Sequence, residues 1–361
     1  MARALIIGAG AIGRGFLPWV FQNFDLTFYD SNQPLIESLN KSKGYKTFMS
    51  LNEELKELKV SNAEFVNSID QLNFKSFDIA IVCVGPRNLI NLSKNFSNLT
   101  CPLYSLENDS NTVFFLRNYL KKENIYFGVP DVITSLTASP ENLELDINAL
   151  HTENGVLYLE DHGDISKKLK NFLPDIKWVS KQRMLKEWDA KLYIHNTPHC
   201  IAAYYGYLMK CNYLHEALKI KSIKLALDGV VDEVLQTLKI ITNHDHDFLE
   251  WYAAKEISRF SNPLLFDPIT RVAREPLRKL DPEGRLVGIL KLALEAGVMP
   301  INLANGIAAS LRYNQEKDSD FFLINNLDSI GIDAFLDYIL RISSKSIEGK
   351  LIINAHKNFR L

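Results

Sequence analysis

The chain has 361 residues, of which 47% are hydrophobic and 23% are charged, and its formal net charge is −2. This length favours two domains with separate hydrophobic cores, and the balanced charge argues against the broad basic surface that nucleic-acid binding requires. The apolar runs are shorter than the ~20 residues that span a bilayer, and no signal peptide precedes the first expected strand, so we expect a cytoplasmic protein without a membrane partner.

Short apolar runs alternate with amphipathic stretches over residues 1–188. This alternation predicts an α/β domain with a mainly parallel sheet. An amphipathic helix is expected over residues 13–24. The expected strands are residues 3–8, 26–30, 77–85, 101–108, 125–131 and 155–161.

Over residues 189–361, apolar residues recur mainly at helical spacing and strand signals are few. This pattern predicts an all-α domain. The expected fold is therefore an α/β Rossmann-type dinucleotide-binding domain followed by an all-α domain that binds the substrate. The expected helices are residues 199–220, 222–243, 247–260, 285–297, 301–313 and 330–345.

A glycine-rich turn, "GAGAIG", follows the first expected strand and opens the first expected helix. Gly8 permits the tight turn, Gly10 leaves room for a pyrophosphate, and Gly13 lets the helix approach the strand. The second expected strand ends in Asp30, where a carboxylate can bind the ribose hydroxyls of NAD and repel the 2′-phosphate of NADP. We therefore predict NAD as the cofactor, bound by Gly8, Gly10, Ala11, Ile12, Gly13 and Asp30.

The segment "KLYIHNTPH", residues 191–199, lies at the expected domain junction, where substrate pockets are common. Oxidation of an alcohol requires a group that accepts the hydroxyl proton and donors that stabilise the developing oxyanion. Lys191 is the candidate base, and Asn196 and His199 are the candidate donors. Pro198 has no N–H and indicates that a helix begins close to it. From these residues alone, a capped helix start with a solvated lysine is the alternative.

We predict no metal site in this sequence. The stretch "HDHD", His244–Asp247, offers the nearest approach to zinc-ligand spacing and is expected to be a polar loop. The cysteines show no C-x-x-C spacing, so we expect them to be reduced and inert. They are Cys83, Cys101, Cys200 and Cys211.

The arrangement of Lys191, Asn196 and His199 resembles the signature of the polyol-specific long-chain dehydrogenases and reductases. The resemblance implies metal-independent hydride transfer, in which the lysine is the general acid or base and the asparagine and histidine hold the reacting oxygen. His195 is an alternative donor outside the signature. Further matching stretches follow in order over nearly the whole chain: "GAGAIGRGF", "VGPRNL", "LEND", "RVAREPLRKLDPEGRL" and "NLANGIAASLRY".

The same resemblance implies further site residues. Val84 and Gly85 are expected to form a turn over the dinucleotide. Asn108 is expected near the nicotinamide, with Glu107 orienting it. Structural turns are the alternative for both segments. Asp131 is expected to contact the substrate.

The segment "RVAREPLRKL" is rich in arginine, the side chain best shaped to bind a phosphate group. Pro276 is expected to break its helix. A solvated helix face is the alternative for this segment, and the resemblance favours a ligand-facing role. The candidate phosphate ligands are Arg271, Arg274, Arg278 and Lys279.

One segment and one single residue depart from the family pattern. Residues 133–138 replace a usual Asp-Arg-Ile-Val-Pro sequence, and Pro198 replaces a usual glycine or serine. The resemblance implies an NAD-dependent dehydrogenase that interconverts a hexitol phosphate and a ketose phosphate, in particular mannitol 1-phosphate and fructose 6-phosphate. A dehydrogenase of a free polyol or a hexuronate, and a non-catalytic NAD-binding protein, are the alternatives. The expected partner is a small polyol or sugar phosphate.

Overall fold

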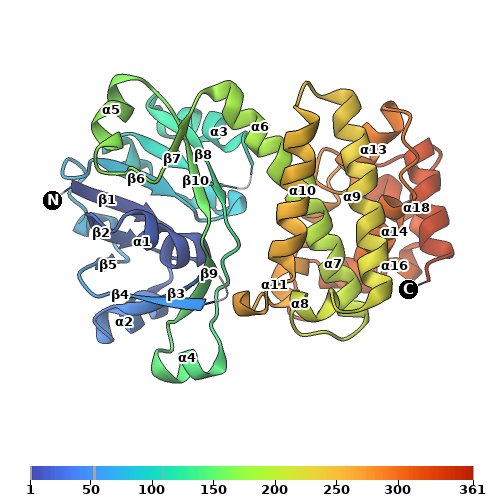
Figure 1. Cartoon of the computed structure of the whole chain (residues 1–361), viewed down its shortest axis with the longest axis horizontal. Helices are drawn as coiled ribbons and strands as arrows, with labels where there is room; N and C mark the ends of the chain where they lie inside the picture. Colours follow the sequence, from blue (N-terminus) through green and yellow to red (C-terminus); the bar gives the residue numbers. More distant parts are fainter. Residues whose placement is uncertain (1, 52–53, 108, 361) are drawn as a thin grey trace. The chain divides into compact units, whose positions relative to one another are not determined.

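The computed structural model describes residues 2–51, 54–107 and 109–360. The chain divides into two compact units: unit 1 is Met1–Trp188 with Leu264–Phe266, and unit 2 is Asp189–Pro263 with Asp267–Leu361 (Figure 1). The sequence division assigned Leu264–Phe266 to the helical domain. This short segment belongs to unit 1 because its carbonyl groups bind side chains there: Leu264 O accepts from His151 Nδ1 at 2.8 Å, and Phe266 O accepts from Ser135 Oγ at 3.2 Å.

Unit 1 is built on an eight-stranded sheet in the order β11-β10-β8-β7-β6-β1-β2-β5. All neighbouring strands are parallel except β8 and β10. The order from β5 to β8 is that of a doubly wound dinucleotide-binding sheet, which confirms the predicted fold class. The strands are β1 (Ala2–Ile7), β2 (Phe24–Tyr29), β5 (Glu64–Val66), β6 (Ile79–Val82), β7 (Leu103–Ser105), β8 (Ile125–Asp131), β10 (Val156–Glu160) and β11 (Lys177–Val179).

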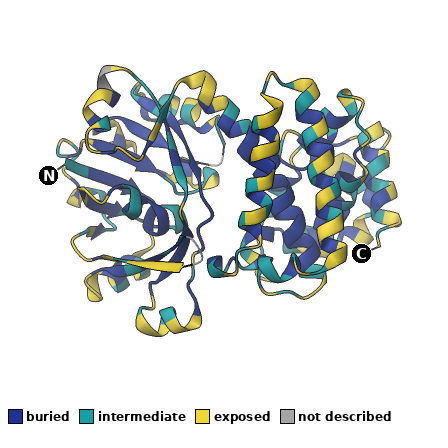
Figure 2. Ribbon diagram, in the orientation of Figure 1, coloured by how far each residue is buried: buried dark blue, intermediate teal, exposed yellow. Residues whose placement is uncertain are grey.

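Strand β1 lies in the centre of this sheet and is covered on both faces. Ile6 belongs to one core cluster, whereas Leu5 and Ile7 belong to another, and all three are fully buried. Side chains alternate between the two faces of a strand, so a strand that is covered on both sides needs an unbroken apolar run. This requirement explains the sequence "ALII", and the buried strands of unit 1 are visible in Figure 2.

A second, three-stranded sheet in the order β4-β3-β9 was not predicted from the sequence. Its outer strand carries the sequence "ELKELKV", and most of the side chains are exposed. A strand with this many charged residues lacks the apolar alternation that would signal it. The three strands are β3 (Tyr45–Leu51), β4 (Glu54–Val60) and β9 (Leu150–Glu153).

The predicted helix over residues 13–24 is wrong in its extent. A π-helical segment, η1 (Ala11–Phe16), follows the glycine turn and passes into the short helix α1 (Leu17–Val20). The helical run stops there because β2 begins at Phe24. The other helices of unit 1 are α2 (Gln33–Lys41), α3 (Thr112–Leu120), α4 (Pro140–Leu145), α5 (Asp164–Lys170) and α6 (Lys181–Asp189, whose last residue belongs to unit 2), with the short turns η2 (Ile69–Gln71), η3 (Pro86–Asn91) and η4 (Lys94–Asn98).

Unit 2 is helical throughout its regular structure, as predicted. The expected helices at residues 222–243 and 247–260 correspond to α9 (Lys221–Ile241) and α10 (His246–Phe260). Those at residues 285–297 and 301–313 correspond to the shorter α13 (Val287–Glu295) and α14 (Ile301–Ser310). In Figure 2, buried and exposed residues separate along α9 and α10, which is the amphipathic pattern that made them recognisable.

Two expected helices are interrupted. The helix expected at residues 199–220 ends at Leu208, and Lys210 then adopts a left-handed conformation with φ of 60°. The helix expected at residues 330–345 ends at Leu340, where Arg341 has φ of 57°. The remaining helices of unit 2 are α7 (Asn196–Leu208), α8 (Leu214–Ala217), α11 (Ile269–Ala273), α12 (Pro276–Lys279), α15 (Phe321–Asn325), α16 (Leu327–Ile330), α17 (Ile332–Ala334) and α18 (Ile347–Lys357). Unit 2 also contains the π-helical segments η5 (Ala190–His195) and η7 (Phe335–Leu340). The short turn η6 (Pro263–Leu265) begins in unit 2 and ends in unit 1.

Across the described ranges, no helix has both the length and the apolar character needed to cross a membrane.

Candidate active site

The glycine-rich turn joins β1 to η1 in unit 1. Gly8 has φ of +108°, and a Cβ atom there would lie 2.6 Å from the Cys83 carbonyl oxygen. A Cβ atom on Gly13 would lie 2.0 Å from the Gly8 carbonyl oxygen. At Gly10, in contrast, a Cβ atom would meet no described atom within 4 Å. The packing of the chain itself therefore requires Gly8 and Gly13, whereas Gly10 leaves backbone that a bound group could approach.

Asp30 directly follows β2, and its carboxylate closes onto the glycine-rich turn. Ala9 N donates to Asp30 Oδ2 at 2.7 Å, and Asn32 N donates to Oδ1 at 2.8 Å. A carboxylate offers about four lone pairs, so each oxygen can accept another hydrogen bond. The other predicted cofactor residues of this turn, Ala11 and Ile12, are the first residues of η1 and are partly exposed.

Glu107 ties the end of β7 to the turn that follows β6. Val84 N and Gly85 N donate to Glu107 Oε1 at 2.7 Å and 3.0 Å. Glu107 is 4% exposed, and burial raises the pKa of its carboxyl to about 7 although both amide bonds favour the ionised form. The side chain thus fixes the backbone of Val84 and Gly85. Asn108, which Glu107 was expected to orient, lies outside the described residues.

Lys191 and Asn196 lie in a helical stretch of unit 2 whose hydrogen bonding changes midway. The π-helical segment η5 is followed directly by α7, and Asn196 N donates to the Lys191 carbonyl oxygen. Bonding from residue i to i+5 brings residues five apart onto one face, and residues three apart share a face of an α-helix. The π segment therefore aligns Lys191 with Asn196, and α7 aligns Asn196 with His199. All three side chains are buried.

The prediction that a helix begins near Pro198 is wrong. α7 starts at Asn196, directly after η5, so the proline lies inside a longer helical run. Where the hydrogen bonding changes from the π to the α pattern, one carbonyl group receives no backbone N–H. Pro198 has no N–H to donate, so it fits at this change of pattern. The segment "KLYIHNTPH" is therefore the junction of two helix types.

His199 is the first member of a chain of three polar side chains in unit 2, of which His199 and Asp267 are buried and Arg271 is partly exposed. His199 Nε2 lies 3.0 Å from Asp267 Oδ2, and Arg271 Nε donates to Asp267 Oδ1 at 2.7 Å. Burial alone would raise the pKa of Asp267, but the charge of Arg271 and the bond with His199 outweigh it and lower that pKa. Burial lowers the pKa of His199, so the ring is neutral near pH 7 and donates Nε2–H to Asp267. Its Nδ1 atom is then a hydrogen-bond acceptor.

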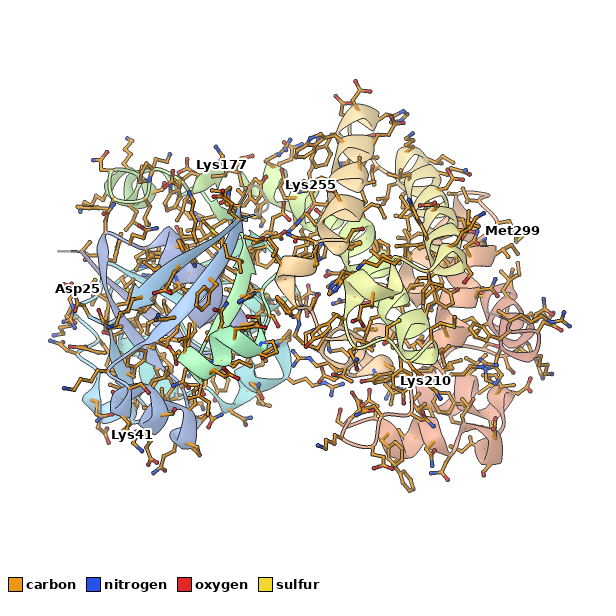
Figure 3. The ribbon with its side chains drawn as sticks, turned by 60° about the horizontal axis from the view of Figure 1, so that its bottom comes forward. Asp25, Lys41, Lys177, Lys210, Lys255 and Met299 are labelled. Carbon is orange, nitrogen blue, oxygen red and sulfur yellow. The ribbon has the colours of Figure 1, made fainter. Side chains whose placement is uncertain are left out.

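His195 has a carboxylate partner of its own. Its Nδ1 atom is hydrogen-bonded to Glu256 Oε2, and burial lowers the pKa of the ring to about 4. The neutral ring donates Nδ1–H, which leaves Nε2 as an acceptor. Glu256 Oε1 also accepts from Arg259 NH1 at 2.5 Å and lies 3.2 Å from Nζ of Lys255, which is labelled in Figure 3. The ring centroids of His195 and His199 are 5.0 Å apart.

The arginine-rich segment is divided as predicted: α11 ends at Ala273 and α12 begins at Pro276. The cations of this segment have different surroundings. Arg271 is bonded to Asp267, and Arg278 Nε donates to Glu275 Oε2 at 3.0 Å. Arg274 is exposed, whereas Lys279 is buried and donates to the Arg274 carbonyl oxygen.

Asp131 is buried at the end of β8 in unit 1, and the unusual stretch that follows it is tied to β9. Thr134 Oγ1 lies 2.7 Å from Thr152 Oγ1, and Ser135 N donates to the His151 carbonyl oxygen at 2.8 Å. Residues 133–138 are thus held mainly by hydrogen bonds within unit 1.

The stretch His244–Asp247 leads into α10, whose first residue is His246. Asp245 caps that helix by accepting from Asp247 N at 2.9 Å, and His244 Nε2 lies 3.4 Å from Asp189 Oδ2. Among the residues that the structure describes, no group of three or more histidine, cysteine, aspartate or glutamate side chains is arranged to hold a metal ion. All four cysteines are free thiols.

Comparison with known proteins relates the whole chain to one group. Residues 185–330 match the family model of the mannitol dehydrogenase C-terminal domain. A mannitol-1-phosphate 5-dehydrogenase from Caldanaerobacter subterraneus is 30% identical, over 96% of this chain and 95% of the relative. The chain belongs to the mannitol dehydrogenase family. A mannitol-1-phosphate 5-dehydrogenase of Buchnera aphidicola is 27% identical over 98% of both chains.

Solved structures support the fold of this family member. The mannitol 2-dehydrogenase of Pseudomonas fluorescens, solved as a ternary complex with NAD and D-mannitol, matches with a TM-score of 0.79 at 14% identity, over 99% of this chain and 90% of that one. A D-mandelate dehydrogenase matches with a TM-score of 0.57 at 14% identity, over 85% of this chain and 96% of that one. At these identities, the matches establish the fold alone.

Sequence reasoning missed the two acidic partners of the histidines. Glu256 and Asp267 are 61 and 68 residues away from His195 and His199 in the chain. No local motif connects residues so far apart. For Glu256 the available signal was an acid within a helix of otherwise apolar spacing, where a buried carboxylate needs a partner. Asp267 precedes α11 in irregular structure and carries no such signal.

Proposed function

We propose that this protein is an NAD-dependent oxidoreductase that interconverts mannitol 1-phosphate and fructose 6-phosphate. The observation that carries this proposal is the full-length similarity to mannitol-1-phosphate 5-dehydrogenases, the nearest of those described being 30% identical. The burial and alignment of Lys191, Asn196 and His199 in unit 2 also support it. These three residues can accept the hydroxyl proton and hold the reacting oxygen, as this reaction requires.

Unit 1 binds NAD in this proposal. The open backbone at Gly10 suits the pyrophosphate, and Asp30 keeps acceptor capacity for the ribose hydroxyls. Glu107 holds Val84 and Gly85 in the turn that would contact the dinucleotide. When bound, NAD supplies the acceptor for the hydride that leaves the carbinol carbon.

Unit 2 supplies the acid and base chemistry. In the oxidation direction, neutral Lys191 Nζ accepts the proton of the reacting hydroxyl, and in reduction its ammonium returns that proton to the carbonyl oxygen. The Asn196 amide donates to the oxygen while it carries negative charge.

His199 positions the substrate in this proposal. Since its Nε2–H is committed to Asp267, the neutral ring offers Nδ1 as an acceptor for a substrate hydroxyl group. Asp131 of unit 1 is a further candidate for a substrate hydroxyl, and it is the last residue of β8.

A substrate panel tests the proposal. Initial rates with NAD should give the highest kcat/KM for mannitol 1-phosphate when it is compared with a pentitol phosphate, mannitol and a hexuronate. A higher kcat/KM for mannitol or a hexuronate would favour the alternative substrates. Binding of NAD without oxidation of any of these compounds would favour a non-catalytic protein.

A further inference from the structure

Arg285 is a buried cation without a counter-ion in the described parts of the chain. It is 9% exposed, and its backbone carbonyl oxygen accepts a hydrogen bond from Thr197 Oγ1 at 2.7 Å. Arg271 and Arg278 are each bonded to a carboxylate, but no described carboxylate pairs with the Arg285 guanidinium. Burial lowers the pKa of Arg285 to about 10, which is a measure of how unfavourable its surroundings are for the charge.

Two further polar groups of unit 2 lie within electrostatic range of this guanidinium. Lys279 is 3% exposed, and its Nζ atom is 5.7 Å from the centre of the Tyr204 ring. The Tyr204 hydroxyl is buried and has no hydrogen-bond partner among the described residues. The charges of Arg278 and Arg285 lower the pKa of Lys279 further, after the larger effect of burial. The Arg285 guanidinium thus lies among described groups that offer it no negative charge to pair with, and the Tyr204 hydroxyl is left with its hydrogen-bonding capacity unused.

Such an arrangement costs stability in the absence of a ligand. An unpaired buried charge and an unsatisfied buried hydroxyl both destabilise the folded state, because each has lost its hydration without gaining a partner. A bound anion would remove both penalties. A tetrahedral oxyanion fits best, because it has enough oxygen atoms to accept from a guanidinium, an ammonium and a phenol together.

We propose that Arg285, Lys279 and the Tyr204 hydroxyl form a buried subsite for the phosphoryl group of a phosphate monoester. This inference rests on the proposed function for the identity of the monoester. It assigns phosphate recognition to Arg285, which the sequence motif did not single out. Arg271 has no part in this subsite because Asp267 engages it.

The subsite is linked to the proposed reacting centre through α7. Thr197, which bonds to the Arg285 backbone, is adjacent to Asn196 in the chain. Cys200, whose thiol is within electrostatic range of Lys279 and Arg285, is adjacent to His199. Thr197, Cys200 and Tyr204 recur at spacings of three and four residues and so share one face of the helix. Helix α7 therefore carries Asn196 and His199 and also contributes Tyr204 to the phosphate subsite.

Two variants test the subsite. Arg285→Met removes the charge, and Tyr204→Phe removes one oxygen that has no partner in the described structure. Arg360→Met and Tyr338→Phe are matched controls, because Arg360 is exposed and Tyr338 is 82% exposed. The first measurement is the thermal midpoint with and without inorganic phosphate, which requires neither NAD nor turnover.

In phosphate-free buffer, Arg285→Met should raise the thermal midpoint and Tyr204→Phe should leave it unchanged or raised. Inorganic phosphate should stabilise the wild type and both controls but not Arg285→Met. Tyr204→Phe should weaken phosphate binding by about 3- to 10-fold, the usual loss for one hydrogen bond. Equal stabilisation of wild type and Arg285→Met by phosphate would overturn the inference.

Kinetics provide the second measurement. Arg285→Met should raise KM for mannitol 1-phosphate at least about 10-fold and leave KM for mannitol unchanged, since only the former loses a charged hydrogen bond. Inorganic phosphate should compete with mannitol 1-phosphate, and non-competitive inhibition would overturn the inference.

The proposed function and the subsite can fail separately. If the wild type oxidises mannitol 1-phosphate and both variants keep its KM, the subsite is wrong and the function stands. If the wild type oxidises no phosphorylated polyol, the function is wrong, and loss of the phosphate-dependent stabilisation in Arg285→Met would still support an anion subsite.

Discussion

Asp267 Oδ2 lies 3.0 Å from His199 Nε2, and both side chains are buried. The other carboxylate oxygen is held by Arg271, so the acid cannot turn away from the imidazole without breaking an ion pair. An imidazole whose Nε2–H is fixed by a carboxylate has a defined tautomer and a defined ring orientation. The geometry therefore assigns to Asp267 a positioning role behind His199.

Asp267→Asn should lower kcat by about 10- to 100-fold. The asparagine can donate to Nε2 in place of accepting from it, which moves the histidine N–H to Nδ1, and a charged hydrogen bond worth about 1.5–3 kcal/mol is lost. The pH profile of kcat should shift as well, since the carboxylate no longer affects the ring. Asp333→Asn, at an exposed position, is the control. An unchanged kcat and pH profile in Asp267→Asn would show that the pair is merely structural.

Arg271→Met should reduce kcat by similar factors for mannitol 1-phosphate and for mannitol. This expectation follows from the two bonds between the guanidinium and Asp267, through which Arg271 acts on His199. Initial rates with both substrates provide the test. A rise in KM confined to mannitol 1-phosphate would instead make Arg271 a phosphate ligand, as the family resemblance implied.

Glu107→Gln should become more stable than the wild type as the pH rises. Burial raises the pKa of Glu107 to about 7, whereas an unfolded glutamate titrates near its ordinary value of about 4.3. Between these values the folded state binds more protons, so the wild type loses stability as the pH increases, and the loss is complete above about pH 7. Between about pH 4 and pH 7, the unfolding free energy of Glu107→Gln should therefore rise relative to that of the wild type by about 3 kcal/mol. This value follows from about 1.36 kcal/mol per unit of pKa difference.

Denaturant unfolding of both proteins from pH 4 to pH 8 measures this difference. Glutamine keeps an oxygen that can accept from Val84 N and Gly85 N, so the turn should be preserved. A difference that does not change with pH would mean that Glu107 titrates normally in the folded protein.

Local sequence patterns predicted the elements whose signals are contained in a short stretch. The sequence of β1, the glycine turn and the acid after β2 all lie within the first 30 residues, and α9 and α10 have clear amphipathic spacing. The π-helical segment η5 could not be predicted in this way. Its register change is invisible to any pattern that assumes 3.6 residues per turn, and the pairing of Glu256 and Asp267 with histidines depends on tertiary packing.

NAD should be preferred to NADP by about 100-fold or more in kcat/KM. The Asp30 carboxylate is fixed by Ala9 N and Asn32 N, and a 2′-phosphate beside it would meet a negative charge that cannot move away. A penalty of about 3 kcal/mol corresponds to this ratio. Asp30→Ala should reduce the ratio, and Asp25→Ala, at the exposed position labelled in Figure 3, should not. Equal use of both cofactors by the wild type would remove Asp30 from this role.

Lys191→Ala should lower kcat by about 10²- to 10⁴-fold, the usual contribution of a general acid or base. NAD affinity should be nearly unchanged because the residues proposed to bind the dinucleotide belong to unit 1. In oxidation, the activity of the wild type should rise with pH as the proton acceptor becomes neutral, and this limb should be absent in the variant. Lys181→Ala, at an exposed position of α6, is the control.

Chelators should leave the wild-type rate unchanged if Lys191 is the proton acceptor, because no metal ion is then needed to ionise the hydroxyl group. Should Lys191→Ala retain both full turnover and the pH-dependent limb, another acceptor must take the proton. His195 is the next candidate, because its Nδ1–H is committed to Glu256 and its neutral ring presents Nε2 as an acceptor. His195→Gln would then lose the activity that Lys191→Ala had kept, and the assignment of Lys191 would be wrong.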